Sequence, residues 1–174
     1  MGDILIARTY YGYPDRFYVG DRIGISDNYT ATCQKINKKG EAIFLFDQVF
    51  PKYVKHDEAI TYANFYQQGL FNSSIRAAIV PFRNGDILRL PYAEEIFGDT
   101  NFVKPSGKKQ WELMKTAKNR IAVNLVGEST WYWLANEHEY DPTSFAYATL
   151  GGHAYFNNPS TSYTVRPVFK LKIK

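Results

Sequence analysis

The sequence predicts an α+β domain with short strands at both ends of the chain and helices between them. Runs of β-prone residues separated by Gly, Pro, Asn and Asp occur before residue 50 and after residue 127. Between these regions, apolar residues recur at helical spacing. The chain has 174 residues, of which 45% are hydrophobic and 22% charged, a composition typical of one folded domain.

The N-terminal part of the chain is predicted to form strands. Residues 3–8 and about 17–25 are β-prone and are separated by a cluster of turn residues at 10–15. We assign residues 1–24 to an N-terminal β segment that serves attachment or oligomerisation, and residues 25–174 to the main domain.

A β-hairpin is the clearest local pattern in the first half. Two β-prone runs at 29–36 and 41–50 flank the loop 37–40, in which Gly40 suits a turn that needs positive φ. Cys33, the only cysteine, lies in the first of these strands, where a buried thiol is expected.

Helices are predicted in the middle of the chain from apolar spacing and from end signals. The third begins at Pro91 and ends at Gly98, since Pro suits a first helical turn and Gly a helix end. The acidic pair Glu94 and Glu95 near its start is expected to cap the helix, to complement its dipole and to be solvated. The four predicted helices cover residues 58–70, 71–79, 91–98 and 110–118.

The C-terminal region is predicted to return to strands joined by tight turns. Aromatic and β-branched runs alternate there with Asp-Pro, Gly-Gly and Asn-Pro turn signals. The strands cover residues 131–134, 145–150, 154–156 and 163–173.

Strand alternation assigns these side chains to two faces. Trp131, Trp133 and Leu134 are expected in the core. Ala146 and Ala148 are small residues at strand spacing, and they are expected to point inward. The side chains between them then lie on the opposite face, together with His153 and Tyr155 after the glycine turn.

The order of these C-terminal motifs resembles a known fold. Residues 131–136, 145–148, Gly152 and 165–169 resemble the closing third of the C-type-lectin-like proteins of bacteria and their phages. That group includes the variable proteins of diversity-generating retroelements. Three further segments, at residues 64–73, 88–98 and 120–122, resemble the helical middle of the group, so the resemblance spans about residues 25–173.

The resemblance implies a ligand-recognition face in the segment that varies in the retroelement proteins. The expected ligand-binding residues are Asn136, His138, Tyr140, Tyr147, Thr149, His153, Tyr155, Asn157, Asn158 and Tyr163. Tyr suits such a face because it offers a large rigid contact area with little entropy to lose. The alternative is a β region that only carries polar residues outward. The expected structural residues are Trp131, Trp133, Ala146, Gly152, Arg166 and Pro167.

Arg166 is the one charged residue of the final motif. We expect a buried or half-buried guanidinium that bonds backbone carbonyls or a carboxylate and fixes the last strand to the preceding loop. Direct contact with a ligand is the alternative.

Enzymatic chemistry is not expected. The enzymes that share the C-type-lectin-like fold, formylglycine-generating and sulfoxide-synthase-like, require a cysteine pair or a histidine-rich iron site. This chain has one Cys, and its three His are not at metal-ligand spacing. We therefore expect no cofactor, no metal and no catalytic residue, and we keep an oxidase relative as the least favoured reading.

The charge pattern and the resemblance together define the expected setting. The formal charge of +4 is spread along the chain, so nucleic acid is not an expected partner. No stretch has the length of a membrane span, and no signal peptide is recognised. We expect a phage virion or extracellular adhesion or display protein that binds a protein or glycan on a host cell, contacts other virion proteins and forms a homo-oligomer. The alternative is a structural virion component without an external ligand.

Overall fold

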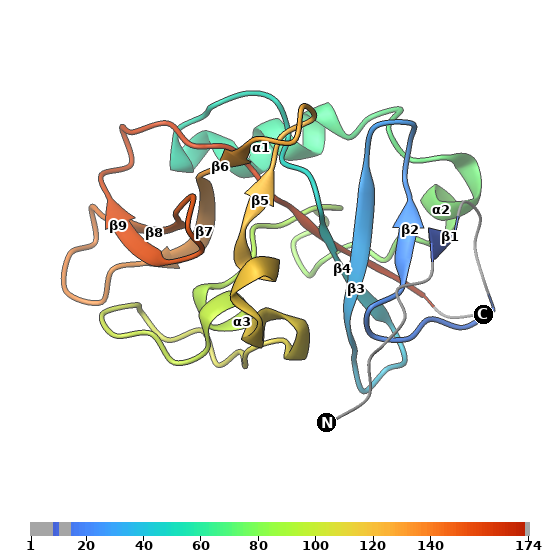
Figure 1. Ribbon diagram of the computed structural model, residues 1–174, viewed down its shortest axis with the longest axis horizontal. Coiled ribbons are helices and arrows are strands. Elements are labelled where there is room, and N and C mark those ends of the chain that lie inside the picture. The colour runs from blue at the N-terminus through green and yellow to red at the C-terminus, as the bar shows by residue number, and fades with distance from the viewer. Residues whose placement is uncertain (1–8, 11–14, 173–174) are drawn as a thin grey trace.

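The computed structural model describes residues 9–10 and 15–172, and these form the predicted α+β fold (Figure 1). Across these residues, strands form three sheets, accompanied by three α-helices and two 3₁₀ turns. A five-stranded sheet forms one end of the molecule and a three-stranded sheet the other, as the blue and orange strands of Figure 1 show. The predicted strand at 3–8 lies outside the described residues.

The five-stranded sheet contains both ends of the described chain. Its order is β1, β2, β3, β4, β10, with β1 and β2 parallel and every other pair antiparallel. The predicted strand at 17–25 is shorter than expected, since only Arg22–Gly24 forms β2. The five strands are Thr9–Tyr10, Arg22–Gly24, Thr30–Ile36, Ala42–Phe46 and Val168–Leu171.

The hairpin of β3 and β4 forms where the sequence predicts it. The Asn37 side chain accepts hydrogen bonds from the backbone N–H groups of Lys39 and Glu41, at 3.0 and 2.9 Å. Gly40 then takes φ of 81°, a conformation that costs glycine little. The β3–β4 turn is therefore built from local side-chain and glycine chemistry, the kind of signal a sequence carries directly.

The C-terminal strand β10 pairs with β4 and is shorter than the predicted strand 163–173. Pro167 has no N–H group to donate and lies immediately before β10. Upstream of it, Tyr163 and Thr164 form isolated bridges with Val54 and Tyr132. The chain thus joins the three-stranded region to the five-stranded sheet before it enters β10.

The helical middle follows the predicted order but is shorter and more broken. Asn72 caps α2 by accepting a hydrogen bond from the N–H of Ile75 at 3.0 Å. The predicted helix 110–118 is instead two 3₁₀ turns, because Thr116 is extended between them. The elements are α1 (His56–Tyr66), α2 (Ser73–Ala78), α3 (Ala93–Phe97), η1 (Glu112–Lys115) and η2 (Ala117–Arg120).

Before β10, the last third of the described chain contains five further strands. A two-stranded ribbon of β5 (Ala122–Val123) and β6 (Ser129–Thr130), which the sequence does not predict, precedes the three-stranded sheet. That sheet has the order β7, β8, β9, with both pairs antiparallel. Its strands are Tyr132–Glu137, Phe145–Ala148 and Ala154–Asn157.

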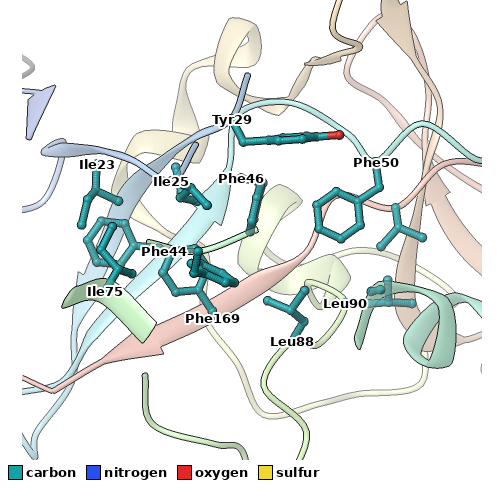
Figure 2. Close-up of a cluster of buried hydrophobic side chains, with 14 of the residues drawn as sticks. Ile23, Ile25, Tyr29, Phe44, Phe46, Phe50, Ile75, Leu88, Leu90 and Phe169 are labelled. Atoms are coloured by element: carbon teal, nitrogen blue, oxygen red, sulfur yellow. The ribbon is translucent and has the colours of Figure 1, made fainter. Parts of the chain in front are cut away.

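Two apolar clusters cover the two faces of the five-stranded sheet. The first is rich in aromatic rings from β4, β10 and the adjoining loops, and Figure 2 shows Phe44, Phe46 and Phe169 packed among them. The second lies between the other face and the α3, η1 and β7–β8 region. Trp133 belongs to the first cluster, and its indole N–H donates to the carbonyl of Val54 at 2.8 Å.

The prediction that Trp131 lies in the core is wrong. Its side chain is 37% exposed, whereas the next three residues, Tyr132, Trp133 and Leu134, are fully buried. β7 begins after Trp131, and both of its faces are covered: Trp133 packs into the first cluster, Tyr132 and Leu134 into the second. A strand that is buried on both faces has a continuous run of apolar residues. Alternation of apolar and polar residues therefore did not show where β7 begins.

Candidate functional site

The β8–β9 hairpin carries an aromatic and polar surface. Tyr147 and Tyr155 are cross-strand partners, and the next pair on the same face is Phe145 and Asn157. The ladder continues toward the turn, where the N–H of Thr149 donates to the carbonyl of His153 at 2.8 Å. The tyrosine face, as we call it, consists of Tyr147, Thr149, His153, Tyr155, Asn157 and Tyr163.

Tyr155 is the most accessible ring of the tyrosine face. Its side chain is 60% exposed, and its ring centroid lies 6.4 Å from that of Tyr147. Tyr147 is half-buried and stacks on Tyr163, with centroids 4.3 Å apart. Tyr163 is buried, and its hydroxyl accepts a hydrogen bond from the Asn157 amide at 2.9 Å. The three tyrosines therefore lie in a row of increasing exposure, in which Tyr147 stacks on Tyr163 and Tyr155 lies tilted beside Tyr147.

A buried base holds this stack in place. Trp133 packs edge-on against Tyr163 at a centroid distance of 4.7 Å. Beside it, the His56 ring stacks on Phe145 at 3.8 Å, and His56 Nε2 lies 2.8 Å from the carbonyl oxygen of Leu134. Burial lowers the pKa of His56, so the neutral ring that packs here is the favoured form. These contacts restrict the rotamers of the side chains beneath the tyrosine face.

The phenol of Tyr147 is neutral at physiological pH. Burial and the neighbouring Tyr163 hydroxyl raise the pKa of Tyr147 to about 12. A neutral phenol both donates and accepts hydrogen bonds, and its ring offers an apolar plate. The face therefore combines flat aromatic area with hydroxyl, amide and imidazole groups, and it includes no carboxylate or ammonium group.

His138 and Tyr140 do not join the tyrosine face. The His138 ring packs edge-on against Phe156, with centroids 4.7 Å apart, and Phe156 pairs with Ala146 on the opposite side of the hairpin. Tyr140 is 75% exposed, and its ring centroid lies 6.2 Å from that of His138. Six of the ten expected ligand-binding residues form the tyrosine face, whereas His138 and Tyr140 lie on the side of the hairpin to which Phe156 points.

Asn136 was expected on the ligand-binding rim, and the structure places it inside. It lies in β7, and its side-chain oxygen accepts a hydrogen bond from the N–H of Ala93 at 2.7 Å. Its amide donates to Glu94 Oε1 at 2.7 Å and to the carbonyl of Lys104 at 3.0 Å. Asn136 thus connects β7, the first turn of α3 and the loop before η1.

Glu94 and Glu95 are likewise buried instead of solvated. Glu95 forms a bidentate ion pair with Arg89, at 2.8 and 2.9 Å, and accepts a hydrogen bond from the N–H of Tyr92. For Glu94, burial opposes ionisation, but hydrogen bonds from Ser106 and Asn136 outweigh it and hold the pKa of Glu94 below its ordinary value. The pair therefore anchors the start of α3 as a buried network.

Asn158 lies in the turn after β9. It is exposed, and its side chain accepts a hydrogen bond from the N–H of Ser160 at 2.9 Å. This contact shapes the turn beside the tyrosine face.

The expected structural residues of the C-terminal motif are buried, apart from Trp131. Arg166 donates from Nε to the carbonyl of Phe46 at 2.7 Å, and from Nη1 to the carbonyl of Asn119 and the hydroxyl of Tyr132. Its guanidinium therefore connects β4, η2 and β7. Ala146, Gly152 and Pro167 are buried, and the carbonyl of Pro167 accepts from the N–H of Phe46 at 3.1 Å.

His56 contributes to the site, and the sequence analysis did not identify it. It precedes the predicted helix, and its partner Phe145 is 89 positions away. A signal that links these two positions would need covariation between related sequences, which one sequence does not contain.

Comparisons with known proteins give no match. No protein-family model matches the chain, and neither the curated proteins nor the solved structures include a similar one. Within residues 9–10 and 15–172, no group of three or more His, Cys, Asp or Glu side chains is placed to hold a metal ion. None of the helices in this part of the chain is long and apolar enough to cross a membrane.

Proposed function

We propose that the protein binds its ligand non-covalently through the tyrosine face. The observation that carries this proposal is the row of three rings in which Tyr147 stacks on Tyr163 and Tyr155 lies tilted beside Tyr147, 60% exposed. Leaving a large ring in water forfeits the stabilisation of burying it, on the order of 2 kcal/mol. A ring that is exposed and also held by a rigid base is the arrangement expected of a binding anchor.

A neutral glycan is the ligand chemistry that the face suits best. Sugar rings present flat C–H surfaces that pack on aromatic rings, and their hydroxyls pair with neutral donors and acceptors such as those of Asn157 and Thr149. The absence of charged groups from the six residues disfavours a strongly charged partner. A protein surface rich in aromatic and small polar residues is the other partner that such a face accommodates.

The setting that the C-type-lectin-like resemblance suggests is a phage virion. We propose that the protein acts there in adhesion or display, in contact with other virion proteins and as a homo-oligomer. Several copies on one particle would convert weak single contacts into firm attachment, because each further contact forms at high effective concentration.

The test is the binding of bead-immobilised protein to intact bacterial cells and to purified bacterial surface polysaccharides. We expect Tyr155→Ala to reduce binding by about thirtyfold, the loss that follows from removal of a central aromatic anchor. The control is Phe65→Ala, which removes a ring that is 73% exposed on α1, away from the tyrosine face. Its binding should match that of the unaltered protein.

Two results would overturn the proposal. One is equal binding by Tyr155→Ala and by the unaltered protein. The other is an equal loss in Phe65→Ala, which would show that the effect does not depend on the position of the ring. Absence of binding to every cell and polysaccharide, with both proteins folded by thermal melting, would favour a structural virion component.

A further inference from the structure

A second candidate site is a cleft between the five-stranded sheet and the 3₁₀ turns. The cleft has a volume of about 490 Å³, within the range of pockets that hold small organic ligands. We call it the β3–η2 cleft. Its polar lining consists of Arg22, Thr32, Gln34, Asp47, Lys118, Asn119 and Arg166.

The cleft forms where one face of the sheet changes from apolar to polar. Toward β10, this face presents Leu45 and Val168, which the second apolar cluster covers. Toward β2, the residue that pairs with Leu45 is Thr32, and Thr32 in turn pairs with Arg22. Because a polar face gains nothing from apolar cover, η1 and η2 leave a gap over it.

Gln34 gives this gap a chemical signature. It is the extra residue of a β-bulge, since Cys33 pairs with Phe44 and Lys35 pairs with Ile43, which is adjacent to Phe44 in β4. Gln34 is only 4% exposed, and its amide nitrogen donates to the carbonyl of Thr32 at 3.3 Å. Its side-chain oxygen is buried and has no hydrogen-bond partner in the described structure.

An unpartnered buried acceptor destabilises the folded protein by about 1–3 kcal/mol. Bulges recur beside binding sites, where they re-aim a side chain. The Gln34 oxygen therefore marks a position at which a bound molecule would supply a hydroxyl or amine donor.

Positive charge is the second feature of the cleft. Arg166 is 5% exposed, and its guanidinium is bonded to carbonyls and a hydroxyl. Neither Arg166 nor Lys118 forms an ion pair with any described residue. Asp47 is the one carboxylate of the lining, and it pairs with Arg22 at 3.2 Å. The lining therefore carries an excess of positive charge, which attracts an anion.

The wall opposite the sheet is apolar. Leu113, Ile121 and Val123 line it and are partly exposed. A ligand of this cleft therefore needs three properties: a negative group for Lys118 and Arg22, a hydrogen-bond donor for Gln34, and a C–H surface for the apolar wall.

We propose that the β3–η2 cleft binds an anionic sugar of monosaccharide to disaccharide size. The sugar ring packs on Ile121 and Val123, and a ring hydroxyl donates to the side-chain oxygen of Gln34. The anionic group, a carboxylate or a phosphate, faces the ammonium of Lys118. This site shares no residue with the tyrosine face and does not depend on the function proposed for it.

The test is a titration of isotope-labelled full-length protein with glucuronic acid, glucose 6-phosphate and glucose, followed by backbone amide NMR. We expect the two acidic sugars to shift amides around residues 32–34 and 118–121 with dissociation constants of about 1 mM. Glucose should bind at least about tenfold more weakly, because it lacks the charge. The tighter of the two acidic sugars identifies the anionic group.

Two variants and one control connect these shifts to the cleft. Gln34→Met removes the acceptor at similar side-chain volume, and we expect about tenfold weaker binding together with an unchanged or raised melting temperature. Lys118→Gln should weaken binding about threefold and reduce its salt dependence. The control Lys115→Gln removes an exposed charge from neighbouring η1 that is not part of the lining, and its affinity should stay unchanged.

Several outcomes would overturn the proposal. They are the absence of cleft shifts with both acidic sugars at about 20 mM, equal shifts with glucose, equal weakening by Lys115→Gln, and unchanged affinity in Gln34→Met. Tyr155→Ala separates this site from the tyrosine face, since it should leave the cleft shifts intact.

Discussion

Replacement of Asn136 tests whether this residue is part of the structure or part of a binding surface. In Asn136→Ala, the N–H of Ala93 and the carboxylate of Glu94 both lose a partner at 2.7 Å. A hydrogen bond to a charged group contributes about 1.5–3 kcal/mol, and a buried orphan donor adds about 1 kcal/mol. We expect the free energy of unfolding to fall by about 3 kcal/mol.

Asn136→Asp is a sharper perturbation, because it places a second carboxylate where the amide now meets Glu94. Two carboxylates at this separation repel by about 5 kcal/mol at an effective dielectric constant near 20. The two carboxylates avoid this repulsion when one of them is protonated. Protonation of a group with an ordinary pKa near 4 costs about 4 kcal/mol of folding free energy at pH 7. We expect a loss of about 4 kcal/mol at pH 7.

The pH dependence separates the variant from the unaltered protein. In Asn136→Asp, the folded state holds a proton that the unfolded state releases, so stability rises by about 1.4 kcal/mol per unit as the pH falls from 7 toward 5. In the unaltered protein, the pKa of Glu94 is lowered in the folded state. Its contribution is therefore present above the ordinary carboxyl pKa and is lost as the pH falls below it.

The assay is urea unfolding followed by tryptophan fluorescence, at pH 7 and pH 5. Asn28→Ala is the control, since Asn28 is exposed and its loss should change stability by less than about 0.5 kcal/mol. The reasoning is refuted if Asn136→Ala behaves like this control, or if Asn136→Asp gains no stability on acidification relative to the unaltered protein.

Three further substitutions test other parts of the structure. In Gly152→Ala, the new Cβ would lie 3.1 Å from the carbonyl oxygen of Ala117 at a φ of 78°, so we expect a loss of about 2–3 kcal/mol by urea unfolding. Gly127→Ala, with similar φ and open space, should lose only about 1 kcal/mol. Because burial lowers the pKa of His56, its stabilisation is present above about pH 6.5 and is lost as the pH falls below that value. In His56→Phe, the melting temperature should depend less on pH between 6.5 and 5, and an unchanged slope would assign the pH dependence to other groups. Arg166→Met should lose about 3 kcal/mol, since it leaves the carbonyl of Phe46 unpaired, and a loss below about 1 kcal/mol would contradict the role assigned to the guanidinium.

Patterns local in the chain allowed much of the fold to be predicted. The hairpin of β3 and β4 is set by Asn37 and Gly40, residues whose turn chemistry acts within four positions. The alternation of β8 was also readable, because Ala146 and Ala148 are buried while Phe145, Tyr147 and Thr149 between and beside them are partly exposed. These features depend on neighbours in sequence, which a single chain displays.

Features that depend on distant partners were not predictable. Asn136 resembles a loop residue by composition, but it is buried because Ala93 and Glu94, more than forty positions away, satisfy its polar atoms. His138 was grouped with Tyr147, yet its ring turns toward Phe156 on the other face. The same limit applies to the β3–η2 cleft, whose lining comes from the five-stranded sheet, the two 3₁₀ turns and the C-terminal segment.

The central claim is that the tyrosine face is the ligand-binding surface. Amide hydrogen exchange, measured on the full chain with and without a bound bacterial surface polysaccharide, tests it most directly. We expect slower exchange in residues 145–157 and no change in α1, because the ligand would cover β8 and β9 only. Protection confined to other elements, or no protection at saturating polysaccharide, would contradict the claim.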